Sequence, residues 1–107
     1  YPFHYKNFEF TLNHYFRALY HVFKYLYKAD LTTEQRETYA AIARSKLSQD
    51  ELHLIMFNSL HPKYGYPNML YLIKEFDILD NFNYHLVQPK VYYDLFLNEV
   101  RKVTNPF

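Results

Sequence analysis

Apolar side chains recur at helical spacing through the first quarter of the chain, and this pattern constrains the fold more than any other feature. The six residues follow one another in steps of three or four: Phe8, Leu12, Phe16, Leu19, Phe23 and Leu26. Such steps place them on one face of an α-helix, which we expect to run from about Asn7 to Ala29 after a poorly specified segment, Tyr1 to Lys6. At 1.5 Å per residue this helix is roughly 34 Å long, about the width of a small domain.

Two capping signals predict the next two helices. Thr32 with Gln35, and Ser48 with Glu51, each have the spacing of a capping box, in which two side chains satisfy amides at a helix start. Of these two helices, the first, which begins after Thr32, should reach about Lys46, and the second, which begins after Ser48, should reach about Leu60. We expect the first to bury four apolar side chains: Tyr39, Ile42, Ala43 and Leu47. The second is apolar on most sides, which predicts the most buried helix of the fold.

Proline and glycine mark the later boundaries. The segment 61–67 contains two prolines and the single glycine, which indicates a loop. Asn68 can cap a short helix that ends near Phe76, and Pro89 suits the first position of a last helix that reaches about Val103. The sequence therefore predicts one domain over residues 1–107, an all-α bundle of about five helices with one long N-terminal helix.

Composition excludes several classes of protein. One glycine among 107 residues disfavours a turn-rich β-sandwich and a glycine-cradled nucleotide site, and the lack of cysteine excludes disulfides and thiolate chemistry. No apolar run approaches the roughly 18 residues of a membrane span. The chain begins with Tyr1, so we expect it to be a soluble fragment of a longer protein.

The clearest group of reactive side chains is Arg17, Tyr20 and His21, which lie within one helical turn. They could bind an anion or act on a phosphodiester, with His21 as acid or base and Arg17 stabilising negative charge. The alternative, which we favour for Arg17, is a buried strut paired with a carboxylate of another helix. For His21 both roles remain open, and the residues alone reveal no reaction.

Metal and nucleic-acid sites are not expected. The six histidines form no His-Glu-x-x-His signature or short-spaced pair, so we predict no metal and no cofactor. Aromatic residues alternate with lysine from Lys24 to Lys28, as in proteins that stack single-stranded bases. A net charge of +1 and the helical spacing favour core packing instead, which makes nucleic acid an unlikely partner.

Three blocks of sequence resemble the putative phage abortive infection protein family (AbiC-like). They are His14–Tyr25 (HYFRALYHVFKY), Tyr39–Ser48 followed by Glu51, Leu52 and Asn58, and Leu72–Leu79 (LIKEFDIL). Together they cover about Leu12 to Phe82 in the expected order. The resemblance implies a bacterial defence protein that limits phage propagation. It carries over five positions as a functional motif: Arg17, Tyr20, His21, Arg44 and Asn58.

The resemblance also implies a location and partners. Relatives carry membrane-spanning segments ahead of this domain, so the domain is expected in the cytoplasm, with tethering to the inner membrane by an upstream segment. It would act by binding an unidentified protein partner, a phage trigger or itself. Because 13 Tyr and 10 Phe exceed what one small core can hide, we expect a homo-oligomer, most simply a symmetric dimer.

Two other functions remain open. HEPN-type ribonucleases are also helical defence proteins and place an arginine before a histidine, but at a slightly longer interval than Arg17 and His21. A one-residue slip rotates a helical side chain by about 100°, which weakens this resemblance. A third reading is a helical protein-interaction module unrelated to defence.

Overall fold

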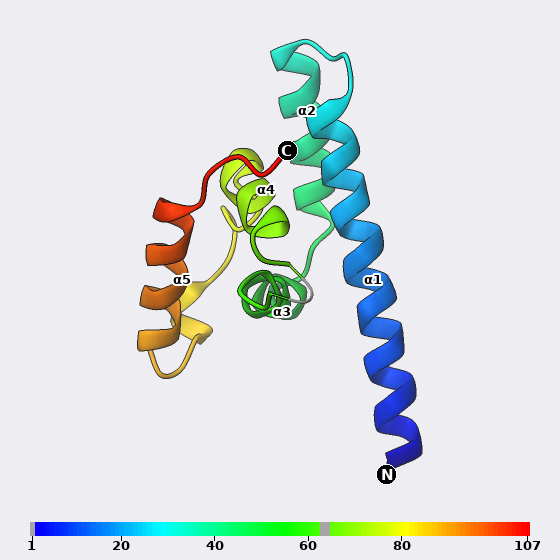
Figure 1. The fold of residues 1–107 in the computed structure, drawn as a ribbon, viewed down its shortest axis with the longest axis vertical. Helices are drawn as coiled ribbons and strands as arrows, with labels where there is room; N and C mark the ends of the chain where they lie inside the picture. The colour runs from blue at the N-terminus through cyan, green and yellow to red at the C-terminus, as the bar shows by residue number, and fades with distance from the viewer. Residues whose placement is uncertain (1, 63–64) are drawn as a thin grey trace.

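The computed structural model describes the backbone of residues 2–62 and 65–107, and the side chains of 14–62 and 65–107. This part of the chain is helical, with no strand (Figure 1). Its elements are α1 (Pro2–Lys28), α2 (Thr33–Ser45), α3 (Gln49–Ser59), α4 (Asn68–Phe76), the 3₁₀ turn η1 (Tyr84–Leu86) and α5 (Val91–Lys102). The predicted all-α bundle of about five helices is confirmed.

Helix α1 is longer than predicted. It begins at Pro2 and contains 27 residues, so it measures about 40 Å. Proline suits this position because the first helical amide has no partner within the helix. The irregular segment predicted before Asn7 is therefore wrong over residues 2–6, and Tyr1 lies outside the described residues. The N-terminal turns of α1 extend beyond the other helices (Figure 1).

The predicted apolar stripe of α1 forms one wall of the core. Phe23 and Leu26 are buried, and Phe16 and Leu19 pack against them. The side chains of Phe8 and Leu12 lie outside the described part. The ring of Phe23 packs on that of Phe76 in α4, with 5.6 Å between the ring centroids.

Helix α4, rather than α3, is the most buried helix. It contacts α1, α3 and α5 and lies between α1 and α5 (Figure 1). Five of its nine residues are buried: Met69, Leu70, Leu72, Ile73 and Phe76. In α3 only four of eleven residues are buried, and Leu54 and Phe57 remain exposed. The prediction for α3 is wrong because only one side of that helix faces α4.

The two capping boxes form as predicted. Ser48 Oγ accepts the amide of Glu51 at 3.1 Å, and Glu51 Oε1 accepts the amide of Ser48 at 3.0 Å. Thr32 and Gln35 make the same reciprocal pair at the start of α2. These local patterns set the starts of α2 and α3 correctly.

The expected starts of α4 and α5 need correction. Asn68 does not cap α4, because its side-chain amide donates instead to the Tyr20 hydroxyl at 3.1 Å. The first turn of α4 is satisfied by loop carbonyls, among them that of Gly65, which accepts the amide of Met69 at 2.7 Å. Pro89 precedes α5 by two residues and accepts the amide of Tyr92 through its carbonyl at 3.1 Å.

Burial in α2 also differs from the prediction. Tyr39 and Ile42 are 48% and 53% exposed, whereas Ala40 is fully buried and Ala43 and Leu47 are partly buried. Ala40 lies on the face between α2 and the core, which Tyr39 and Ile42 flank on the outside. The helical spacing predicted the helix correctly, but it wrongly predicted that Tyr39 and Ile42, rather than Ala40, are buried.

The single glycine is required by a close approach between the loop and α3. A Cβ atom on Gly65 would lie 2.7 Å from the carbonyl oxygen of Asn58 and 2.7 Å from the Cα of Ser59. Both neighbours are backbone atoms near the end of α3, so they cannot rotate away.

We therefore expect Gly65→Ala to destabilise the domain by about 1–3 kcal/mol, the usual cost of overpacking a close contact. Urea unfolding monitored by circular dichroism measures this directly. A midpoint equal to that of the natural sequence would contradict the close approach of this loop to α3.

Candidate functional site

The predicted group on α1 is divided between the core and the solvent. Tyr20 is partly buried, and its hydroxyl accepts the Asn68 amide at 3.1 Å. Its ring meets that of His21 edge to face, with 5.3 Å between centroids. His21 and Arg17 are exposed. Arg17 and His21 thus share a solvent-facing flank of α1, and Tyr20 turns toward α4.

Arg17 is not the buried strut that we favoured, because its side chain is exposed. Arg44 is instead a partly buried arginine that links two helices. Its Nη1 donates to the Phe76 carbonyl at 2.7 Å and its Nη2 to Glu37 at 3.0 Å, with only 14% of the side chain exposed. Phe76 ends α4, and Asp77 follows in the left-handed conformation with φ 49°. Arg44 therefore satisfies a carbonyl at a helix C-terminus, where positive charge is favoured.

Asn58 lies close to Tyr20 but away from Arg44. With Phe16, Ile55 and Met69 the two residues line a small cavity between α1, α3 and α4. The five motif positions therefore occupy three places: Arg17 and His21 on the exposed flank, Tyr20 and Asn58 at this cavity, and Arg44 between α2 and α4.

An open apolar groove runs between α1 and α2. Four of its lining side chains are large and exposed: Val22 (48%), Tyr25 (72%), Tyr39 (48%) and Ile42 (53%). Ala18 and His21 line its α1 side. We call this surface the α1–α2 groove. Residue-by-residue periodicity missed it because the pattern placed Tyr39 and Ile42 in the core.

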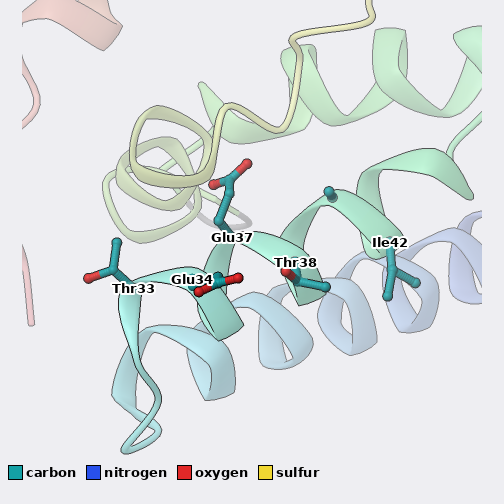
Figure 2. Close-up of a pocket in the computed structure, with 6 residues that line it drawn as sticks. Thr33, Glu34, Glu37, Thr38 and Ile42 are labelled. Carbon is teal, nitrogen blue, oxygen red and sulfur yellow. The ribbon is translucent and has the colours of Figure 1, made fainter.

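A second, shallow depression lies on the outer side of α2 (Figure 2). It is lined by Thr33, Glu34, Glu37, Thr38, Ala41 and Ile42. Ile42 also lines the α1–α2 groove, so the two hollows are neighbours on one surface. The two carboxylates of this region, Glu34 and Glu37, line the depression rather than the groove.

A further group of exposed apolar side chains lies on α3 and α5. Here the rings of Phe57 and Tyr92 contact each other with 6.0 Å between centroids, and Phe57 also stacks on His53 at 5.2 Å. These rings partly cover one another. The α1–α2 groove has no comparable cover and is the stronger candidate for a binding site.

A bond that the sequence did not predict ties α1 to the start of α3. The Tyr15 hydroxyl donates to Oε2 of Glu51, the same carboxylate that completes the capping box. This bond is the largest cause of a lowered pKa at Glu51, followed by the bond from the Ser48 amide. Burial, then the nearby carboxylate, raises the pKa of Tyr15 above its usual value.

The C-terminal residues occupy the lysine-rich end of α1. Phe107 packs on Tyr27 with 5.4 Å between centroids, and the Nζ of Lys28 lies 5.4 Å from the Phe107 ring centroid. Asn105 donates to the Tyr27 hydroxyl at 2.7 Å, and a bond with Tyr27 is the main cause that raises the pKa of Tyr71 to about 12. Of the residues that resembled a base-stacking surface, Lys24, Tyr27 and Lys28 contact other rings of the domain, whereas Tyr25 is exposed.

Among the side chains of residues 14–62 and 65–107, no three His, Asp or Glu gather into a group that could hold a metal ion. None of the helices in the part of the chain that the structure describes combines the length and hydropathy needed to cross a bilayer.

A family model described as putative phage abortive infection protein matches residues 7–86, well over half of the chain. No curated protein and no solved structure gives a significant match.

The Tyr15–Glu51 bond predicts acid sensitivity. Because the folded pKa of Glu51 lies below its usual 4.5, the bond stabilises the fold fully above about pH 4.5, and this stabilisation is lost as the pH falls through the lower folded pKa. Glu51→Gln should have a lower free energy of unfolding than the natural sequence at pH 7, and this difference in free energy should become smaller below pH 4.5. Urea titrations at several pH values test this. Asp50→Asn is the control, because it removes a carboxylate from the same turn without touching Tyr15. If the free energy of unfolding of Asp50→Asn approached that of the natural sequence at low pH as much as that of Glu51→Gln does, the assignment of the effect to the Tyr15–Glu51 bond would be contradicted.

Removal of Arg44 should lower the stability of the fold, whereas removal of Arg17 should leave it almost unchanged. Arg44→Ala leaves the Phe76 carbonyl without its donor and should cost about 1.5–3 kcal/mol, the range for a hydrogen bond to a charged group. Its bond to Glu37, which is 66% exposed, should add little. Arg17→Ala should stay within about 0.5 kcal/mol of the natural sequence. Chemical denaturation of both variants decides the point, and a large loss for Arg17→Ala would restore it as a strut.

Proposed function

The chain belongs to the putative phage abortive infection protein family, and from this premise we propose that the domain serves phage defence by binding a protein surface through the α1–α2 groove. One observation carries the proposal. Val22, Tyr25, Tyr39 and Ile42 leave a continuous apolar surface in solvent, whereas sixteen other apolar side chains among the described residues are buried. Exposed apolar surface of this kind is typical of an interface.

The energetics favour an occupant. Fully burying a side chain of the size of Ile42 contributes about 1.5–3 kcal/mol relative to leaving it in water. Tyrosine is enriched in interfaces because its ring supplies apolar area and its hydroxyl keeps a hydrogen bond at the rim. Two tyrosines and two aliphatic residues can therefore act as the anchors of a binding surface.

The chemistry of the groove supports binding rather than catalysis. The polar side-chain groups that line it are the His21 imidazole and the hydroxyls of Tyr25 and Tyr39. Nucleophilic and acid–base catalysis require an activated group held against a partner. The groove offers apolar walls with one imidazole at its rim, which suits recognition of a partner.

The ribonuclease alternative rests on a different surface. Arg17 and His21 are both exposed and stand one helical turn apart on α1, so they could approach a phosphodiester together. The Nζ atoms of the neighbouring Lys24 and Lys28 lie 5.9 and 5.4 Å from the centroid of the Phe107 ring, and Lys28 remains exposed, so this flank of α1 offers further positive charge to a nucleic-acid backbone. This observation keeps the nuclease as the second candidate.

A plaque assay in cells that express the full-length natural protein separates these functions. We expect Ile42→Glu to abolish protection and Arg17→Ala to retain it, because only the first change places a charge in the groove. Leu95→Glu is the matched control, since Leu95 is 52% exposed on α5 and lies outside the groove.

The reverse result identifies the nuclease. Loss of protection in Arg17→Ala and His21→Ala, with Ile42→Glu active and tRNA or mRNA cleaved by the purified natural domain, would overturn the binding proposal. Circular dichroism of each variant checks that a loss of protection does not result from unfolding of the domain. Protection that survives all of these changes would place the defence function outside both the groove and the Arg17–His21 flank. A natural protein that gives no protection would indicate an interaction module unrelated to defence.

A further inference from the structure

We propose that the α1–α2 groove is occupied by the same groove of a second copy of this chain, with α1 of each copy lying on α2 of its partner. This inference rests on the proposed binding function and names its partner. It follows from the charges on the two sides of the groove and from the shape of the depression that borders it on α2.

The α1 side of the groove is basic. Arg17, His21, Lys24 and Lys28 recur at steps of three and four residues, so they share one flank of the helix. His21 lines the groove, and Lys24 and Lys28 reach the Phe107 ring at the C-terminus. The basic flank therefore lies between the groove and the C-terminal residues, on the side of α1 away from α2.

The α2 side is acidic. Glu34 and Glu37 line the shallow depression on the outer side of α2, beyond Ile42 (Figure 2). Across the surface the order is thus a basic flank, the apolar groove and an acidic flank. Glu37 already bonds to Arg44, which leaves Glu34 as the main carboxylate for a partner.

A two-fold axis can bring this surface against itself in two ways. With the axis across the helices, α1 lies on the partner's α1, and each flank meets a flank of its own sign. With the axis along the helices, α1 lies on the partner's α2, and each basic flank meets an acidic one. Charge complementarity selects the second arrangement, which is a closed, isologous pair.

The shapes agree with the same arrangement. Tyr25, at 72% exposed, projects most from the α1 side of the groove. The depression on α2 is floored by small side chains, Thr38 and Ala41. Thr38 and Ala41 lie before and after Tyr39 in the sequence, and Tyr39 lines the groove together with Tyr25. Rotation about an axis along the helices places Tyr25 against the partner's α2, next to this depression.

The charged pair falls at the same end of the surface. α1 and α2 are antiparallel neighbours joined by a short connection, residues 29–32. Lys28 lies one turn beyond Tyr25 toward that connection, and Glu34 lies one turn before Thr38 toward it. Lys28 of one copy is therefore placed opposite Glu34 of the other, twice in each dimer.

Sedimentation equilibrium of the 107-residue chain from low to high micromolar concentration is the first test. We expect a monomer–dimer equilibrium that Ile42→Glu shifts to monomer and Leu95→Glu leaves unchanged. Lys28→Glu and Glu34→Lys should each weaken dimerisation roughly tenfold, since each change acts at two symmetry-related pairs, and the double variant should recover most of the loss. Circular dichroism confirms the fold of each variant.

Cross-linking tests the orientation in a chain that has no natural cysteine. Lys28→Cys chains mixed with Glu34→Cys chains should join through a short bifunctional thiol reagent, and neither variant should join efficiently to itself. A chain that stays monomeric at high micromolar concentration, or a mixture that joins no better than its components, would overturn the inference.

The two proposals can fail separately. A monomeric chain whose Ile42→Glu variant still loses protection in cells would remove the second copy as the occupant and leave the groove as the site of another partner. A dimer that Ile42→Glu dissociates without any loss of protection would keep this inference and remove the proposed function.

Discussion

The packing of α1 against α4 is the contact on which the rest of the structure depends. Phe23 is fully buried and meets Phe76, and α4 in turn contacts α3 and α5. A domain of this size has one core, so the helix at its centre must supply apolar side chains in several directions. Helix α4 does so with nine residues, and the long α1 covers one of its sides.

This arrangement explains why α2 presents an apolar surface. α2 packs on α1, contributes Ala40 as its buried residue and sends Arg44 to the end of α4. A polar bond to a helix terminus holds α2 in place without covering its outer face. Tyr39 and Ile42 consequently remain beside Val22 and Tyr25 in the groove. The groove is a consequence of how few helices surround α4.

Membership of the phage abortive infection family gives this surface its biological setting. The residues that the family resemblance singled out do not gather in one place: Arg44 holds α2 to α4, Tyr20 and Asn58 lie at a small cavity, and Arg17 and His21 face solvent. A motif spread in this way is typical of residues that maintain a fold and shape its surface. It agrees with the binding function that we propose for the α1–α2 groove.

The sequence by itself determined the helices, because caps and periodicity are local: Ser48 with Glu51, Thr32 with Gln35, and the stripe that buries Phe23. Only the tertiary structure decided which helix became central, that Arg44 rather than Arg17 is partly buried, and that Ile42 is exposed. The physical reason is that helical spacing fixes which side chains share a face. Whether a face is covered depends on neighbours that are distant in sequence.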